Sequence, residues 1–495
     1  MRFTASLRHL DEHSQSLDAS GWLRDGRGVV HTFNVHMSHR PEKSPQGVRP
    51  RRITFACAAT IAAASVLSAN VSAADSRHGA EAPGGSGWAA DQPNAHGMYE
   101  TFAPDGTIAL RRGGPDDAPR TLPFHTGDRP RTGGPVVIPV HANGPSANRI
   151  DLVFVGDGYT AAEQPKFVAA TERAWQALMS YEPYKTYQNF FNAERIDIAS
   201  PVSGISADPT KDVKKTTPLG MHFWCHGIDR LLCVDNKATA AYQNLVPGRN
   251  HVVALANTTT YGGAGGSITT LAGENDSADQ VIVHEMSHTV GQLGDEYDVP
   301  YETASGDAGT LPNVSENTAS TMTADKTKWA NWIGTPSADG STVGAFEGAN
   351  YYKHGFYRPS ANSNMRQLGI PFNPPSIEAL IKAFYTSPID HGKMDSIDSA
   401  TPDPAKNGVT NRDTTLSIKT VPLVNSTYEI YWALNGTTIP TSIGSTNLNL
   451  ATTTLPKGKW NQVSVYVRDT NPAVRDEAFR TAEMTKARNW WVWGG

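Results

Sequence analysis

The sequence predicts a mixed α/β (α+β) fold, in which a small β module precedes a central domain and a β-sandwich follows it. In the central part, a strand pattern, a helix pattern and a second strand pattern follow one another, which implies parallel strands joined by a helix. Near the C-terminus, short alternating runs separated by turn residues replace this pattern. The segments that we expect, in chain order, are 1–73, 74–96, 97–145, 146–392 and 393–495.

The first segment, 1–73, is typical of a leader. Residues 49–52, Arg-Pro-Arg-Arg, precede an apolar, alanine-rich run that ends in small residues at Ala73, as in a secretory signal peptide. The basic residues lie far from the first residue, so we expect Met37 to be the true start. The mature chain would then begin close to Ala74 as an exported protein without a further membrane span.

The next two segments are predicted from composition and turn residues. Residues 74–96 are mostly small and polar, which predicts a linker. The β module, 97–145, contains β-prone runs on both sides of Asp105-Gly106, a hairpin signal.

The central domain, 146–392, opens with a buried strand at 150–155. Thr160 and Glu163 have the spacing of a capping box for a helix whose apolar residues are Phe167, Val168, Trp175 and Leu178. A second strand is expected at 195–198, and long loops beside a cleft are expected at 298–346. Asp157 lies between the first strand and the helix, and we interpret it as a helix-entry residue.

The last segment, 393–495, is predicted to be an immunoglobulin-like β-sandwich. Strands are expected at 415–418, 428–432 and 463–467, with a tight turn at Asn435-Gly436. Three tryptophans near the end are expected to pack on this sandwich, namely Trp490, Trp491 and Trp493.

The most informative motif is His284-Glu285-Met286-Ser287-His288. Two histidines four positions apart on a helix lie on the same face, so both imidazoles can reach one metal ion. Zinc held in this way activates a water molecule, and Glu285 lies where it can accept the proton of that water. Asn275-Asp276-Ser277 offers N-cap residues for the start of the helix, and Ser277 with Gln280 has the spacing of a capping box.

A third zinc ligand is expected just after the helix, which should end near Gly291 or Gly294 because glycine favours the left-handed turn there. Asp295 and Glu296 follow, and carboxylate oxygen is an acceptable zinc ligand. Asp295 is the preferred ligand and Glu296 the alternative. Upstream, a short apolar run at 251–256 predicts a buried strand. A glycine stretch at 261–267 followed by a β-prone run at 268–272 suggests an edge strand above the cleft, which could bind an extended peptide substrate.

These residues resemble the bacterial immunoglobulin A peptidase family of zinc metallopeptidases. The resemblance rests on the helix motif with Leu293 and Asp295-Glu296-Tyr297 after it, on residues 151–159, and on Tyr357-Arg358-Pro359-Ser360 and Asn364-Met365-Arg366. It implies a metzincin-like domain, a zinc ion, endopeptidase activity and a secreted bacterial protein. Under it, His284, His288 and Asp295 would be ligands, Glu285 the general base and Met365 the methionine turn. Family members often carry cysteines near this methionine, where this chain has Asn364 and Asn373.

Stabilisers of the developing oxyanion are less well determined by the sequence. The candidates are Tyr297, His354, Tyr357 and Arg358.

Cysteine usage is typical of an exported chain. Cys57 lies in the leader, which leaves Cys225 and Cys233 to form a disulfide. The alternative is a second metal site that combines these thiolates with His222 and His226.

The function we expect is a secreted or periplasmic zinc metalloendopeptidase that acts on proteins or peptides. A net charge of -5 without a dominant basic run argues against nucleic acid as a partner. The alternatives are a zinc-holding adhesin or binding scaffold without proteolysis, and a zinc amidase that acts on cell-wall material. The oligomeric state does not follow from the sequence.

Overall fold

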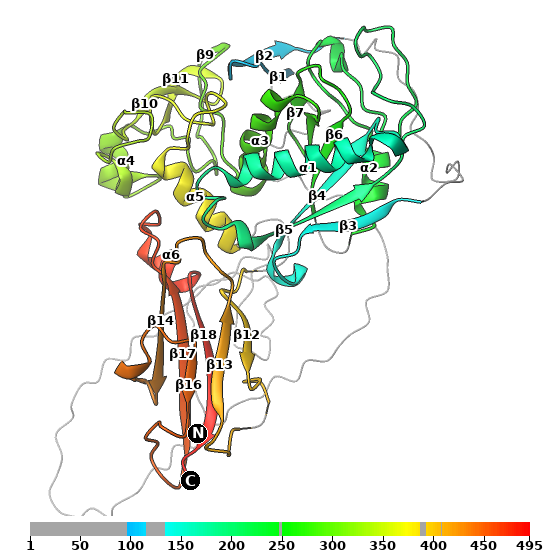
Figure 1. Ribbon diagram of the computed structural model, residues 1–495. Helices are drawn as coiled ribbons and strands as arrows, with labels where there is room; N and C mark the ends of the chain where they lie inside the picture. Colours follow the sequence, from blue (N-terminus) through cyan, green and yellow to red (C-terminus); the bar gives the residue numbers. More distant parts are fainter. Residues whose placement is uncertain (1–96, 115–133, 247–249, 387–392, 407) are drawn as a thin grey trace, which may run out of the picture. The chain divides into compact units, whose positions relative to one another are not determined.

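The computed structural model describes residues 97–114, 134–246, 250–386, 393–406 and 408–495 (Figure 1). The predicted leader and linker, 1–96, lie outside the described residues. The described part combines several sheets with few helices, which confirms the predicted mixed fold class. Within these ranges, no helix is long and apolar enough to cross a membrane.

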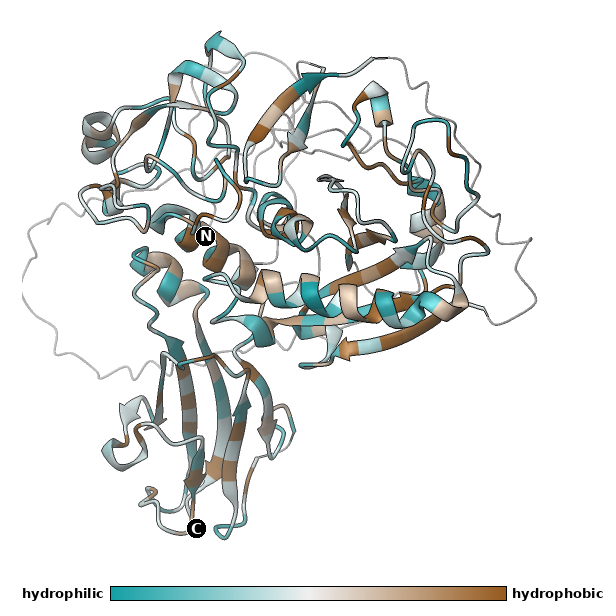
Figure 2. Cartoon of the chain, turned by 45° about the horizontal axis from the view of Figure 1, so that its top comes forward, coloured by the Kyte–Doolittle hydropathy of each residue, from teal (hydrophilic) through white to brown (hydrophobic). Residues whose placement is uncertain are grey.

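Six strands form the central sheet, in the spatial order β3-β5-β4-β6-β8-β7. The four inner strands are parallel to one another, and the edge strands β3 and β7 run antiparallel to their neighbours. All eight residues of β4 are buried, as expected of a strand covered on both faces, and Figure 2 shows hydrophobic stretches along these strands. The predicted parallel pair is confirmed as β4 and β5. The bounds are β3 Val136–His141, β4 Ile150–Asp157, β5 Phe191–Asp197, β6 Asn250–Ala256, β7 Gly263–Ala264 and β8 Ile268–Ala272.

Both helices that the sequence predicts, one after Thr160 and one that carries His284, are present as α1 and α3. The capping box before α1 is confirmed, because the Glu163 carboxylate accepts a hydrogen bond from the Thr160 N–H at 3.1 Å. Val168 was expected on the buried face of α1 but is 38% exposed, since it is one position, or about 100°, away from the buried Phe167. The bounds are α1 Gln164–Met179, α2 Asn236–Gln243, α3 Asp279–Gly291, α4 Ala319–Asp325, α5 Pro374–Thr386 and α6 Glu477–Ala482.

Both ends of α3 differ in detail from the prediction. Of the predicted cap candidates, Asn275 provides the cap: its side-chain oxygen accepts from the Ser277 N–H at 3.0 Å at the start of a 3-10 turn that leads into α3. The helix ends at Gly291 as expected, but the left-handed residue is Gln292, with φ 50°. Its N–H donates to the His288 carbonyl at 2.9 Å, which satisfies one of the carbonyls at the helix end.

The segment after α3 consists mostly of loops, in agreement with the prediction for 298–346. It contains α4 and the short strand β9, which pairs in parallel with β11, while β11 pairs antiparallel with β10. The bounds are β9 Tyr301–Thr303, β10 Phe346–Ala349 and β11 Tyr352–Arg358.

The predicted N-terminal hairpin is confirmed. Strand β1, Met98–Phe102, pairs antiparallel with β2, Ile108–Arg112. Gly106 has φ 83°, and the Thr107 N–H donates to Asp105 Oδ1 at 3.0 Å, so both turn residues have the expected roles. Strand β3, which belongs to the same predicted module, pairs instead with β5 of the central sheet.

The C-terminal part contains two sheets, ordered β12-β13-β16 and β15-β14-β17-β18, whose strands share one apolar cluster. Both Asn435 and Gly436 have positive φ, as the predicted tight turn requires. Trp490 is buried and stacks on Trp432, but Trp491 is 56% exposed because neighbouring strand residues point to opposite faces. The β-sandwich stays a prediction that this arrangement supports. The bounds are β12 Ile397–Thr401, β13 Thr415–Thr420, β14 Tyr428–Leu434, β15 Thr437–Thr438, β16 Asn447–Asn449, β17 Trp460–Asp469 and β18 Thr485–Trp493.

Asp157, at the end of β4, holds a loop by hydrogen bonds and does not begin a helix. Its fully buried carboxylate accepts hydrogen bonds from the Thr217 hydroxyl at 2.7 Å and from the backbone N–H groups of Leu219 and Met221, both at 2.8 Å. Burial raises the pKa of this carboxyl to about 6, against the effect of these donors. The loop at 217–221 is thereby tied to the end of a central strand.

We therefore expect Asp157→Ala to lower the free energy of unfolding at pH 7 by about 3 kcal/mol or more, because three buried donors would lose their acceptor. Urea denaturation followed by circular dichroism measures this change. Asp212→Ala, on an exposed side chain, serves as the matched control and should leave the unfolding midpoint unchanged. Equal midpoints for both variants would contradict the role assigned to Asp157.

Candidate metal centre

Helix α3 brings the two motif histidines together one turn apart. Their Nε2 atoms lie 3.0 Å from each other, and the two rings are close to perpendicular. His284 is fully buried, and the side chain of His288 is 7% exposed. Two nitrogen lone pairs so close together repel each other unless a proton or a cation lies between them.

The other ring nitrogen of each histidine is engaged by a backbone carbonyl. His284 Nδ1 donates to the Asn364 carbonyl at 3.0 Å, and His288 Nδ1 donates to the Leu293 carbonyl at 2.6 Å. A proton held on Nδ1 leaves Nε2 as the lone-pair nitrogen, which is the tautomer that binds a metal. Both carbonyls come from loops, one directly after α3 and one far along the chain.

Asp295 completes a triangle of ligand atoms with the two imidazoles. Its Oδ1 lies 3.3 Å from His284 Nε2 and 3.2 Å from His288 Nε2, and this fully buried atom has no hydrogen-bond partner. Tetrahedral zinc with bonds of about 2.0–2.1 Å would separate its ligand atoms by about 3.3 Å. Tyr351 donates its hydroxyl proton to Asp295 Oδ2, which fixes the carboxylate. The donor set and its spacing therefore fit a zinc ion.

Glu296 points away from this triangle into a polar network of its own. Its carboxylate accepts from the side-chain amides of Asn313 and Asn373, each at 2.9 Å, and from the Ser363 hydroxyl at 2.7 Å. These partners come from two loops, one that carries Asn313 and one between β11 and α5 that carries both Ser363 and Asn373. Its backbone N–H donates to the Met365 carbonyl at 2.7 Å. Of the two adjacent carboxylates, only that of Asp295 converges with the histidines.

Glu285 is buried beside this group, with its side chain directed at the glycine-rich segment. A Cβ atom on Gly265 would lie 1.4 Å from Glu285 Oε2, so only glycine at position 265 admits the carboxylate. Glu285 Oε1 is buried without a hydrogen-bond partner. The run 268–272, predicted as an edge strand for substrate, is the inner strand β8, which pairs with both β6 and β7, so that prediction is wrong. The edge strand is β7, which Gly265 directly follows, and Leu231 already bridges to the outer side of that strand at Gly263.

The remaining predicted residues lie in different surroundings. Met365 is fully buried and follows Asn364, whose carbonyl holds His284. Tyr297 is buried, with its hydroxyl on Glu100. His354 is exposed and pairs with Glu347, and the half-buried Tyr357 lies further along the same strand, β11. Arg358 donates to backbone carbonyls of β10.

Glu100, on the hairpin strand β1, lies beside these ligand atoms although no sequence pattern predicted it. Its Oε1 lies 3.6 Å from His284 Nε2. The ligand atoms of Glu100, His284, His288 and Asp295 all lie within 4.8 Å of one another. The only indication in the sequence was one acidic residue in an otherwise β-prone run.

The predicted disulfide between Cys225 and Cys233 is present, with their Cα atoms 5.8 Å apart. The alternative of a second metal site at these cysteines required free thiolates, which the disulfide removes. His226 instead stacks its ring on Tyr99 of the hairpin, at 4.3 Å between ring centroids.

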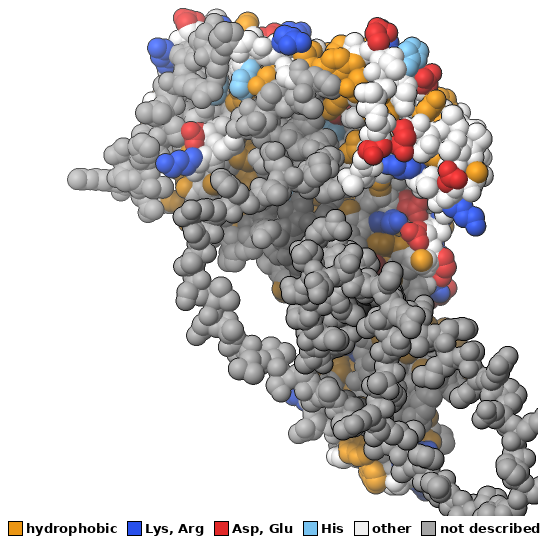
Figure 3. All heavy atoms as spheres, turned by 180° about the vertical axis from the view of Figure 1, so that it is seen from behind, with side chains coloured by type: hydrophobic (Ala, Val, Ile, Leu, Met, Phe, Trp, Pro, Cys, Tyr) orange, Lys and Arg blue, Asp and Glu red, His pale blue; other side chains and the backbone are white. Residues whose placement is uncertain are grey.

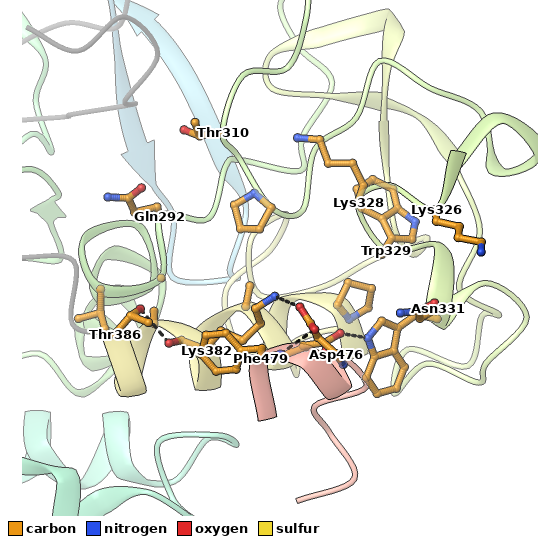
Figure 4. Close-up of a pocket in the computed structure, with 18 residues that line it drawn as sticks. Gln292, Thr310, Lys326, Lys328, Trp329, Asn331, Lys382, Thr386, Asp476 and Phe479 are labelled. Atoms are coloured by element: carbon orange, nitrogen blue, oxygen red, sulfur yellow. Dashed lines mark hydrogen bonds and ion pairs between the residues drawn. The ribbon is translucent and has the colours of Figure 1, made fainter. Parts of the chain in front are cut away.

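A cavity of about 420 Å³ lies at the C-terminal end of α3, where Gln292 contributes to its wall (Figure 4). Lys382 and Asp476 line it and form an ion pair of 2.8 Å, beside the rings of Trp332 and Phe479. No residue of the four-ligand cluster lines this cavity, so it is separate from the candidate metal centre.

The charged side chains of the described residues show no separation by sign on the face seen in Figure 3, where acidic and basic groups are interspersed. This distribution agrees with the small net charge of -5.

Comparison with known proteins identifies the family. A search of curated proteins gave no match. The family model described as IgA Peptidase M64 matches residues 138–338 and 334–384, which include the central sheet from β3 onward, α3 and the loops that hold its histidines. The chain therefore belongs to the IgA peptidase M64 family, a family of metallopeptidases.

Proposed function

We propose that this protein is a secreted, zinc-dependent metalloendopeptidase. The observation that carries the proposal is the convergence of His284 Nε2, His288 Nε2 and Asp295 Oδ1 at 3.0–3.3 Å from one another, with a buried carboxylate on the residue next to His284. Two nitrogens and one oxygen form the ligand set of catalytic zinc sites, which keep a fourth position open.

The zinc ion, when bound, would lower the pKa of a water molecule and polarise the scissile carbonyl. The chain supplies the rest of the chemistry. Glu285 accepts the proton of the attacking water through its unpartnered Oε1 and returns that proton to the leaving amine. The fixed Nδ1 contacts keep both imidazoles in one orientation while this proton moves.

Two features support an extracellular location. The sequence of residues 1–73 is typical of a leader, and Cys225 and Cys233 form a disulfide, a bond that persists in oxidising compartments. A protein or peptide is the substrate class that we propose. The name of the family does not by itself make immunoglobulin A the substrate of this chain.

Glu285→Gln should retain zinc and lose peptidase activity by about 10²–10⁴-fold, because the amide keeps the shape of the side chain but cannot accept a proton. Metal analysis of the purified protein and cleavage of a mixed peptide library measure the two effects. Glu302→Gln, at an exposed position on β9, is the matched control and should keep both properties. Full activity in Glu285→Gln would remove the proposed mechanism.

Asp295→Ala should weaken zinc affinity by more than about 100-fold, since even the removal of groups that only orient ligands costs 10- to 100-fold. Glu296→Gln should keep its zinc and lower the thermal midpoint, because one amide N–H would face the buried donors of Asn313 and Asn373. Zinc titration against a competing chelator, with melting curves, separates the two effects. Loss of zinc from a folded Glu296→Gln variant would show that Glu296 is the ligand.

A further inference from the structure

The hairpin β1–β2 covers the candidate metal centre. All five residues of β1 are buried, although the hairpin forms a sheet of only two strands. Phe102 contacts the His284 ring edge-on, at 5.7 Å between ring centroids. This packing helps to bury Glu100 and His284, two members of the metal cluster.

Glu100 reaches the metal cluster from this hairpin. Its side chain is 5% exposed, and Oε1 lies 3.6 Å from His284 Nε2, close to the separation expected for two ligands of one zinc ion. Tyr297 donates its hydroxyl proton to the same oxygen, which orients the carboxylate. With the triangle of the two histidines and Asp295, Glu100 makes four protein ligands. Four protein ligands are typical of a closed zinc site, whereas a catalytic site leaves one position for water or substrate.

The hairpin is held at several separate points. The Tyr99 ring stacks on His226 and packs in a buried cluster with the disulfide of Cys225 and Cys233. Arg111 pairs with Asp229 at 3.3 Å in the same loop. At the turn of the hairpin, the Gly106 carbonyl accepts from the Leu368 N–H at 2.9 Å.

This position is also where a substrate would have to approach. Tyr99 of β1 shares its apolar cluster with Ala264 of β7, the edge strand of the central sheet. The residue after Ala264 is Gly265, against which the Glu285 carboxylate lies. A peptide that reaches both the metal and Glu285 past this edge would meet the hairpin, because β1 packs against β7.

We propose that Glu100 is a fourth metal ligand and that the hairpin β1–β2 keeps the peptidase latent until the hairpin is displaced. This inference rests on the proposed metallopeptidase function. Glu100 takes the position that water needs, and the hairpin blocks the approach to the edge strand. Activation then requires movement or removal of the hairpin. Glu100 leaves with the hairpin, and His284, His288 and Asp295 remain as the metal ligands.

The test uses the full chain, stripped of metal and reloaded with one equivalent of Co²⁺, and acetohydroxamic acid as a probe for an open metal position. In the wild type, the visible Co²⁺ spectrum should respond only weakly to the probe. In Glu100→Ala, the probe should bind at least about tenfold more tightly, because a closed state populated above about 90% lowers apparent affinity by that factor. The rate of peptide cleavage should rise by a similar factor.

Three further variants keep the test decisive. Glu100→Gln preserves side-chain volume and an acceptor for Tyr297, and it should shift the probe affinity in the same direction as Glu100→Ala. Tyr99→Ala leaves Glu100 in place but removes the ring that packs on the disulfide loop, so it should also increase probe affinity. Glu302→Gln, an exposed substitution of the same type, should behave as the wild type.

The outcomes separate this inference from the proposed function. Equal probe affinities in the wild type, Glu100→Ala and Glu100→Gln would overturn the assignment of Glu100 as a ligand, even if all three cleave peptides. Unchanged affinity in Tyr99→Ala alone would overturn the role of hairpin docking. Tight probe binding in Glu100→Ala without cleavage by any variant would support the ligand assignment and refute the peptidase function.

Discussion

The arrangement of the site depends on the two hydrogen bonds that fix the imidazoles of α3. Nδ1 of His284 and of His288 each donates to a backbone carbonyl, and only then do both Nε2 lone pairs face the same point. One carbonyl, that of Leu293, is placed by the end of α3 through the left-handed Gln292. The other, that of Asn364, is placed by a loop that the Glu296 network holds through Ser363. The helix end and the distant loop are therefore parts of the metal centre, although neither provides a ligand.

The adjacent carboxylates Asp295 and Glu296 have different roles. Asp295 is a candidate metal ligand, and Glu296 holds loops together by hydrogen bonds. Both residues lie in the irregular segment after α3, where the Asp295 carboxylate faces the histidines and the Glu296 carboxylate faces the loops. Glu296 accepts at least three hydrogen bonds and so gathers the loops that carry Asn313, Ser363 and Asn373. Asp295 accepts one from Tyr351 and keeps Oδ1 unpartnered. Satisfied hydrogen bonding thus distinguishes a structural carboxylate from a candidate ligand.

Sequence patterns were sufficient where the relevant contacts are local. The capping box at Thr160 and the turn at Asn435-Gly436 depend on neighbouring residues and were predicted correctly. The pairing of β4 with β5 was also predicted correctly, because a strand, a helix and a second strand in this order imply a parallel pair. Glu100 was missed because its contact with Tyr297 joins residues 197 positions apart, and no periodicity reports such a contact. The exposure of Trp491 was mispredicted because composition alone does not give the register of a strand. Local patterns thus predicted the motif of His284 and His288, whereas the side chains that surround this motif depend on tertiary packing.

Charge balance links the hairpin to the reactivity of the site. Two neutral imidazoles with the carboxylates of Asp295 and Glu100 carry a charge of about -2, which a divalent cation neutralises, so the closed cluster can be buried at low cost. Withdrawal of Glu100 would leave one carboxylate, that of Asp295, to hold the cation, and the centre next to Glu285 would then carry a net positive charge. A positive centre favours the loss of a proton from water and attracts a carbonyl oxygen. The same carboxylate that makes the closed state stable therefore makes it unreactive, and its departure opens the coordination position and restores the charge that hydrolysis needs.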